Sequence, residues 1–210
     1  MIGRPDFDRG AIWIDCAGEN NSGTGKTTLA RLIAGELADP INVVETKGAD
    51  VDKNWCRDMA DTAQYCAWGS KPFRVWIINE SHAISAGAVD YLLAFLDSMP
   101  RHCVLIFTTT RKADAGLFGN DDGPFYSRCL RVTLTNQGLA KAFGARVASI
   151  ARAEQLDGGR QDDWFVRLVQ KYKNNLRASL QAVWAGAALL VSDSDTERSE
   201  EHTSELQSPM

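Results

Sequence analysis

The chain has 210 residues, of which 44% are hydrophobic and 24% are charged. This composition excludes a disordered or fibrous protein, and the length suits one globular domain with its own core plus a smaller one. The net charge of −4 neither favours nor excludes a nucleic-acid partner, because a basic face can form locally.

The cysteines and the apolar stretches exclude several further classes of protein. The five cysteines include no Cys-x-x-Cys pair, so they predict neither a zinc site nor a disulfide framework. We therefore expect a cytoplasmic protein in a reducing compartment. No signal peptide is expected, and the longest apolar stretch, residues 182–191, is too short to cross a bilayer.

The strongest motif is a glycine-rich segment that follows an apolar run at residues 11–17 and precedes a helical pattern. Strand, glycine-rich loop and helix form the context of a phosphate-binding P-loop, in which backbone N–H groups and the helix dipole face the phosphates. Lys26 would reach the β- and γ-phosphates, and the Thr27 hydroxyl would bind Mg²⁺. The residues expected to bind the nucleotide here are Asn20, Asn21, Ser22, Gly23, Thr24, Gly25, Lys26, Thr27 and Thr28.

One position departs from the P-loop pattern, because Asn20 stands where the first glycine is usual. Asparagine is one of the few residues that tolerate positive φ, so the loop can keep its path while the affinity for nucleotide changes. The alternative interpretation is a glycine-rich turn between a strand and a helix with a chance Lys-Thr pair. The strand and helix on either side favour the phosphate site.

After a second strand at residues 41–46 and a helix, the run at 73–80 suits a buried parallel strand. It ends in Asn79 and Glu80, where P-loop ATPases usually carry Asp-Glu to hold Mg²⁺ and polarise the attacking water. Asn79 keeps an oxygen but lacks the charge that a hard cation prefers. We expect weak Mg-ATP binding through Asn79, with Glu80 as the base. The alternative is a core strand that ends in a turn.

Residues 104–110 predict another buried strand, whose last residue, Thr110, would lie beside the strand at 73–80, where a polar side chain can touch the γ-phosphate or the water. The alternative is that Thr110 reflects only the preference of threonine for strands. A loop at 112–125 and the short segment Ser127-Arg128-Cys129 precede a strand at 130–134.

From residue 135 onward the pattern is helical, with three expected helices at 137–156, 164–172 and 174–191. Three short helices make a small bundle. We therefore divide the chain into an α/β domain at 1–134, a helical domain at 135–192 and a disordered tail at 193–210. The tail resembles translated sequencing-adapter DNA and is expected to be non-native.

Taken in order, these motifs resemble the AAA+ ATPases of sliding-clamp loaders, which include the DNA polymerase III gamma/tau and replication factor C small subunits. Residues 23–31 are similar to the family's Walker A, 75–82 to its Walker B and 108–110 to its sensor 1. Ser127-Arg128-Cys129 matches the family's Ser-Arg-Cys motif, and 175–181 resembles its sensor 2 helix. The resemblance implies a P-loop AAA+ domain with a parallel sheet flanked by helices, followed by a small all-helical lid.

The resemblance also implies roles for individual residues. Glu80 would activate water, Thr110 and Arg177 would sense the γ-phosphate, and Arg128 would act as an arginine finger on the ATP of a neighbouring subunit. The alternatives are a surface arginine for Arg128 and a solvated helix residue for Arg177. The implied cofactors are ATP and Mg²⁺. The implied partners are other clamp-loader subunits in a hetero- or homo-oligomer, a sliding clamp and primer-template DNA, with no membrane.

Three functions remain open from the sequence. The first is an ATP-hydrolysing clamp-loader subunit in DNA replication, supported by intact Lys26, Thr27 and Glu80. The second is a non-hydrolysing structural subunit that supplies Arg128 to its neighbour, favoured by Asn20 and Asn79. The third is another AAA+ DNA-processing motor such as a branch-migration helicase, which the Ser-Arg-Cys motif disfavours. A small-molecule P-loop kinase would need neither sensor 1 nor a helical lid.

Overall fold

The computed structural model describes residues 10–17, 22–110 and 125–190. By its internal contacts the chain divides into two compact units, Met1–Asn136 and Gln137–Met210. No helix in the described part of the chain is long and apolar enough to span a membrane.

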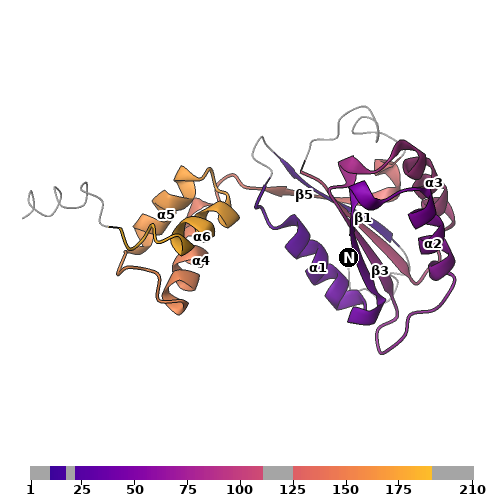
Figure 1. Ribbon diagram of the computed structural model, residues 1–210, viewed down its shortest axis with the longest axis horizontal. Coiled ribbons are helices and arrows are strands. Elements are labelled where there is room, and N and C mark those ends of the chain that lie inside the picture. The colour runs from indigo at the N-terminus through magenta and orange to yellow at the C-terminus, as the bar shows by residue number, and fades with distance from the viewer. Residues whose placement is uncertain (1–9, 18–21, 111–124, 191–210) are drawn as a thin grey trace, which may run out of the picture. The chain divides into compact units, whose positions relative to one another are not determined.

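The first unit is built on one parallel sheet of five strands in the order β2-β3-β4-β1-β5 (Figure 1). The strands are β1 (Gly10–Ala17), β2 (Val43–Lys47), β3 (Arg74–Asn79), β4 (Cys103–Thr108) and β5 (Cys129–Thr135). Since all five run the same way, their carboxyl ends meet at one edge, where open α/β sheets usually bind ligands.

Helices cover both faces of this sheet, which explains why the central strands read as continuous apolar runs. Helix α1 (Lys26–Leu37) packs on one face, and helices α2 (Lys53–Ala63) and α3 (Ala86–Ser98) lie on the other (Figure 1). Side chains alternate between the faces along each strand. In β3, for example, Val75 and Ile77 contact the α1 side, whereas Trp76 and Ile78 contact the side of α2 and α3.

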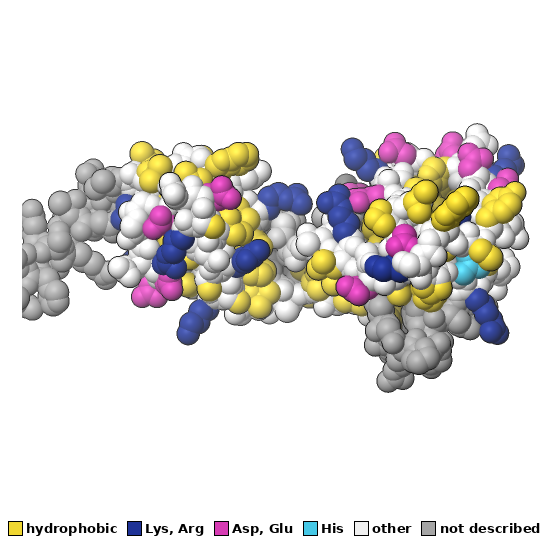
Figure 2. All heavy atoms as spheres, turned by 90° about the horizontal axis from the view of Figure 1, so that it is seen from below, with side chains coloured by type: hydrophobic (Ala, Val, Ile, Leu, Met, Phe, Trp, Pro, Cys, Tyr) yellow, Lys and Arg dark blue, Asp and Glu magenta, His cyan; other side chains and the backbone are white. Residues whose placement is uncertain are grey.

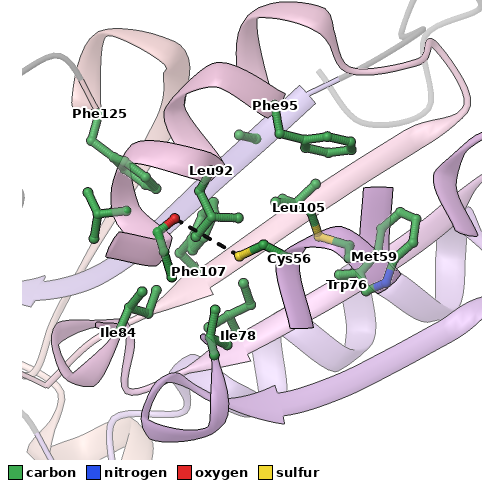
Figure 3. Packing of buried hydrophobic residues seen from close by; sticks show 14 of the residues in the cluster. Cys56, Met59, Trp76, Ile78, Ile84, Leu92, Phe95, Leu105, Phe107 and Phe125 are labelled. Carbon is green, nitrogen blue, oxygen red and sulfur yellow. Dashed lines mark hydrogen bonds between the residues drawn. The ribbon is translucent and has the colours of Figure 1, made fainter. Parts of the chain in front are cut away.

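The larger core lies on the side of α2 and α3 and is rich in aromatic rings (Figure 3). Phe107 of β4 lies 5.8 Å from Trp13 of β1 and 5.0 Å from Phe125 between ring centroids. Trp13, Phe107 and Phe125 are each no more than 1% exposed. This packing ties β1 and β4 to the segment that leads into β5.

The expected second strand begins later than the sequence predicted. Residues Pro40–Asn42 form a 3₁₀ turn, and β2 starts only at Val43. Proline fixes φ near the helical range and lacks an N–H group, so it begins such a turn easily.

The second unit contains helices α4 (Ala140–Ala153), α5 (Asp162–Lys171) and α6 (Leu176–Trp184) (Figure 1). A common core joins them through buried residues such as Val147, Phe165 and Val183. The expectation that the third helix runs to residue 191 is wrong. Gly186 has φ 87° and donates to Val183 O, and Ala187 donates to Ala182 O, which is the hydrogen-bond pattern of a Schellman helix end.

The surface carries charges of both signs. On the face drawn in Figure 2, Lys and Arg side chains lie among Asp and Glu side chains on each unit. Large apolar side chains are also exposed, including Trp68 at 79% and Tyr65 at 70% in the first unit. This view therefore offers no single basic face to which a DNA contact could be assigned.

Candidate active site

The start of α1 has the features that a phosphate cradle needs. Gly23 and Gly25 adopt φ 71° and 90°, which residues with a Cβ atom seldom adopt. Gly25 is the N-cap of α1 and has no side chain to occupy the first amides of the helix. Lys26 follows at once, is only 6% exposed, and donates from Nζ to Thr24 Oγ1 at 3.2 Å. The amides and the ammonium group together suit an anionic ligand.

The other loop residues divide into two groups. Ser22, the first described residue of the loop, and Thr28, in the first turn of α1, are both exposed. Asn20 and Asn21 lie outside the described residues, so the effect of the missing first glycine stays a prediction.

The carboxyl edge of the sheet carries a row of polar side chains on the α1 side. Glu45 of β2 pairs in register with Ile77 of β3, two residues before Asn79 at the end of β3, and Thr108 is the last residue of β4. Asn79 Oδ1 accepts hydrogen bonds from Thr27 Oγ1 at 3.1 Å and from Thr108 Oγ1 at 2.9 Å. Asn79 Nδ2 donates to Glu45 Oε1 at 2.7 Å. Thr27 and Asn79, the two expected Mg²⁺ ligands, are therefore in direct contact.

Glu45 is held in turn by Arg31 of α1. The guanidinium forms two parallel hydrogen bonds to the carboxylate, Nε to Oε2 at 2.8 Å and Nη2 to Oε1 at 2.9 Å. These bonds, with a smaller contribution from the Asn79 amide, hold the pKa of Glu45 below its ordinary value. Glu45 was not expected from the sequence, although its place near the end of the strand beside β3 could have suggested it.

Glu80 follows β3 directly and has an unusual backbone. Its φ of 53° and ψ of 49° lie in the left-handed region, which costs a residue with a Cβ atom about 1 kcal/mol or more. Gly48 packs against this segment so closely that a Cβ atom there would lie 2.4 Å from Glu80 O. The backbone at Glu80 therefore packs tightly against the 3₁₀ turn Gly48–Asp50, which follows β2.

Two side chains approach the carboxylate of Glu80. Thr110 Oγ1 donates to Oε2 at 2.6 Å, and His82 Nδ1 lies 3.4 Å from the same oxygen. His82 Nδ1 also lies 3.1 Å from Thr109 Oγ1. The structure thus brings Thr110 and Glu80 together as expected. The sequence analysis gave no role to His82, although it stands only two residues after Glu80.

Arg128 lies in a 3₁₀ turn (Tyr126–Arg128) just before β5 and pairs with Asp97 of α3. Its Nε donates to Asp97 Oδ1 at 2.6 Å and its Nη2 to Oδ2 at 3.0 Å. The pair raises the pKa of Arg128 and lowers that of Asp97. The sequence analysis did not anticipate this partner within the same chain.

Arg177 lies exposed in the first turn of α6, after Asn175, whose Oδ1 caps the helix by accepting from the Ala178 N–H at 3.0 Å. Arg177 belongs to the second unit, whereas the P-loop belongs to the first. Its expected role as a γ-phosphate sensor therefore remains a prediction.

The residues at this edge fit a Mg-nucleotide. Hydroxyl and amide oxygens from Thr27 and Asn79 are the hard ligands that Mg²⁺ accepts, and Mg²⁺ usually takes its remaining ligands from phosphates and water. No group of three or more His, Cys, Asp or Glu that could form a metal cage occurs among the described residues. A metal brought in with nucleotide phosphates suits this donor set better than a dedicated protein cage.

Comparison with known proteins identifies relatives of this architecture. The family described as "ATPase family associated with various cellular activities (AAA)" matches residues 20–118. The chain is 28% identical over 159 residues to DNA polymerase III subunit tau of Bacillus subtilis, covering 64% of this chain and 26% of the relative. It is 31% identical over 111 residues to DNA polymerase III subunit gamma of Buchnera aphidicola, covering 42% of this chain and 30% of the relative. The chain thus spans between a quarter and a third of these relatives.

Solved structures share the fold. The RuvB Holliday junction branch migration motor of Thermotoga maritima superposes with a TM-score of 0.59 at 21% identity, covering 83% of this chain and 52% of that chain. A DNA polymerase III gamma subunit-related protein of the same organism gives a TM-score of 0.51 at 12% identity, covering 85% and 54%. At these identities the likeness shows the fold alone. The expected parallel sheet flanked by helices is confirmed.

Proposed function

We propose that this chain binds and hydrolyses ATP as a subunit of a DNA sliding-clamp loader, because residues 20–118 match the AAA ATPase family and the chain is similar to DNA polymerase III subunits tau and gamma. The observation that carries this proposal is the meeting of Thr27, Asn79, Glu80 and Thr110 at one edge of the sheet, beside the loop that ends at Lys26. Each of these side chains suits one step of phosphoryl transfer to water.

Lys26 and the amides after Gly25 would bind the phosphates and offset their negative charge. Mg²⁺, when bound with ATP, would neutralise charge that develops on the phosphate oxygens. Thr27 and Asn79 would supply oxygen ligands to it. These groups position the γ-phosphate without taking part in proton transfer.

Glu80 would accept a proton from the attacking water. In the same step the oxygen of that water would form a bond to the γ-phosphorus, and the bond between the γ-phosphorus and the ADP oxygen would break. Thr110 donates to Glu80 Oε2, where His82 also approaches, so the second oxygen, Oε1, is the one directed to this task. Thr110 thus orients the base as well as lying where the γ-phosphate is expected.

Arg128 and Arg177 would complete the site only in an assembly. We propose that Arg128 leaves Asp97 to reach the nucleotide of a neighbouring subunit, and that Arg177 approaches the chain's own nucleotide as the helical unit acts as a lid. The other subunits, the sliding clamp and primer-template DNA are the proposed partners, on the basis of what the relatives are named.

Two other functions have an observation in their favour. Asn79 lacks the negative charge usual at its position, which favours a subunit that binds ATP without hydrolysing it. The likeness to the RuvB motor favours a branch-migration role at the level of the fold. ATP turnover separates the first of these from the main proposal, and a requirement for primed DNA separates the second.

The experiment is ATP turnover by the full chain at high protein concentration with Mg²⁺, with and without primed DNA. We expect turnover to fall ~100-fold or more in Glu80→Gln, as removal of a general base usually causes, while ATP binding is retained. Turnover that is equal in the two proteins would refute the role of Glu80. ATP binding without turnover in either protein would support the non-hydrolysing subunit.

A further inference from the structure

The contacts of Glu45 point to a role that the proposed function does not include. Glu45 stands on β2, beside β3, and its carboxylate touches Asn79, the residue that replaces the usual aspartate. We propose that Glu45 is a positioning residue: it holds the Asn79 amide with its carbonyl oxygen toward Thr27, so that an asparagine can serve as a Mg²⁺ ligand. This inference rests on the proposed function and concerns the same site.

The chemistry of its three partners allows only one orientation of the Asn79 amide. Its carbonyl end accepts hydrogen bonds and its NH₂ end donates them. The hydroxyls of Thr27 and Thr108 can donate or accept, but an ionised carboxylate can only accept. Since Glu45 Oε1 lies 2.7 Å from the amide, the NH₂ group must face it, and Oδ1 must face the two hydroxyls. In the reversed orientation the Asn79 amide oxygen would face the Glu45 carboxylate, and neither group could donate a hydrogen bond to the other.

Glu45 is itself fixed, which a positioning residue requires. Arg31 binds both of its oxygens at 2.8 and 2.9 Å, and the Glu45 side chain is 30% exposed, against 63% for Arg31. Such a partly exposed ion pair adds little to stability, so its main effect is on geometry. Arg31 also lies one turn after Thr27 on α1. Arg31 therefore connects α1 to Glu45 on β2, and Thr27 connects α1 to Asn79 on β3. The Asn79–Glu45 hydrogen bond connects these two contacts.

The same geometry explains why an aspartate would be out of place at position 79 in this chain. Its carboxylate would stand at hydrogen-bond distance from that of Glu45, and two carboxylates this close cannot both ionise without a large cost. One would take up a proton or swing away from Thr27. The effect of a substitution at Asn79 must therefore depend on the residue at position 45.

A double-mutant cycle on the full chain tests this dependence with wild type, Glu45→Gln, Asn79→Asp and the double variant. The introduced glutamine can donate to the introduced aspartate, which reverses the polarity of the same hydrogen bond. We expect Mg²⁺-dependent ATP affinity to fall ~10-fold in Asn79→Asp and ~5-fold in Glu45→Gln, and to return to within ~3-fold of wild type in the double variant. In EDTA the four proteins should bind ATP equally, because the network acts on the metal ligand.

The second readout is the thermal midpoint of the four proteins without nucleotide. It should fall in Asn79→Asp and recover in the double variant. Glu36→Gln provides a matched control, because Glu36 is an exposed acid on α1, and its affinity and midpoint should not change. If the double variant does not fold, Glu45→Ala combined with Asn79→Asp also removes the opposing charge and should bind Mg-ATP more tightly than Asn79→Asp alone.

The possible results separate the inference from the proposed function. Additive effects in both readouts, or a gain of Mg-ATP affinity in Asn79→Asp alone, would overturn the role of Glu45 while ATP binding by wild type stands. If wild type binds no Mg-ATP, the proposed function fails, and the positioning role fails with it even where the midpoints show coupling.

Discussion

Gly48→Ala is expected to disturb the backbone that projects Glu80. Gly48 lies in the 3₁₀ turn Gly48–Asp50, just after β2, and faces the turn that follows β3. A Cβ atom on residue 48 would lie 2.4 Å from Glu80 O, 3.1 Å from Glu80 C and 3.2 Å from Ser81 Cα. All three are backbone atoms, so no side-chain rotation can relieve the contact.

The magnitude follows from this overlap. Overpacking of this kind usually costs about 1–3 kcal/mol of folding free energy. The contact can be relieved only by moving backbone, either at residue 48 or at residues 80 and 81, and a displacement of about 1 Å at a catalytic group can cost ~100-fold in rate. We therefore expect the free energy of unfolding to fall by about 1–3 kcal/mol, and ATP turnover to fall much further than ATP affinity.

Gly35→Ala is the matched control, because a Cβ atom there meets nothing within 4 Å. Gly35 is exposed within α1, where alanine is favoured over glycine by about 0.5–1 kcal/mol. This control should be slightly stabilised and should keep its turnover. Calorimetry and a steady-state ATPase assay measure both effects. A Gly48→Ala protein with the stability and turnover of wild type would refute the view that Gly48 fixes the Glu80 turn.

Two further predictions follow from the pKa shifts. Burial raises the pKa of the Cys103 and Cys129 thiols to about 11 and about 12. Cys66 is exposed, Cys129 is half-buried and Cys103 is buried, so a thiol reagent near pH 8 should label Cys66 first, Cys129 more slowly and Cys103 only after unfolding; rapid native labelling of Cys103 would contradict this. Hydrogen bonds, chiefly from the Lys71 backbone N–H, lower the pKa of Asp39 below its ordinary 3.8, so the folded state binds this proton more weakly than the unfolded chain. The contribution of the Asp39 carboxylate to stability is therefore present above pH 3.8 and is lost as the pH falls through the lower folded-state pKa. The urea midpoint should vary less with pH across this range in Asp39→Asn than in wild type. The same pH dependence in both proteins would contradict this role of Asp39.

Much of the fold could be predicted from local pattern. The buried strands β1, β3 and β4 are continuous apolar runs, and each was expected within a residue or two of its observed bounds. Helix ends were harder, because the apolar pattern of α6 continues past its end at Trp184. There a backbone feature, the left-handed Gly186, outweighs side-chain periodicity.

The site was predictable in its residues and much less so in its contacts. The Thr110–Glu80 bond joins residues that follow neighbouring strands, in agreement with the expectation that Thr110 lies beside the strand at 73–80. Glu45 and Asp97 were missed, because a single sequence gives neither the register of β2 against β3 nor the side of α3 that faces Arg128. Pairs so distant in sequence depend on tertiary packing.

The most direct test of the account is calorimetric titration of the full chain with ATP in Mg²⁺, beside Lys26→Ala. Lys26 is buried at the start of α1, where its charge would bind phosphate, so its loss should weaken binding ~10- to 100-fold. Lys141→Ala, which removes an exposed lysine from α4, should bind as wild type does. Saturable binding by wild type that is lost in Lys26→Ala is the predicted result. Equal binding by wild type and Lys26→Ala, or no binding by wild type, would contradict the assignment of a nucleotide site to this edge of the sheet.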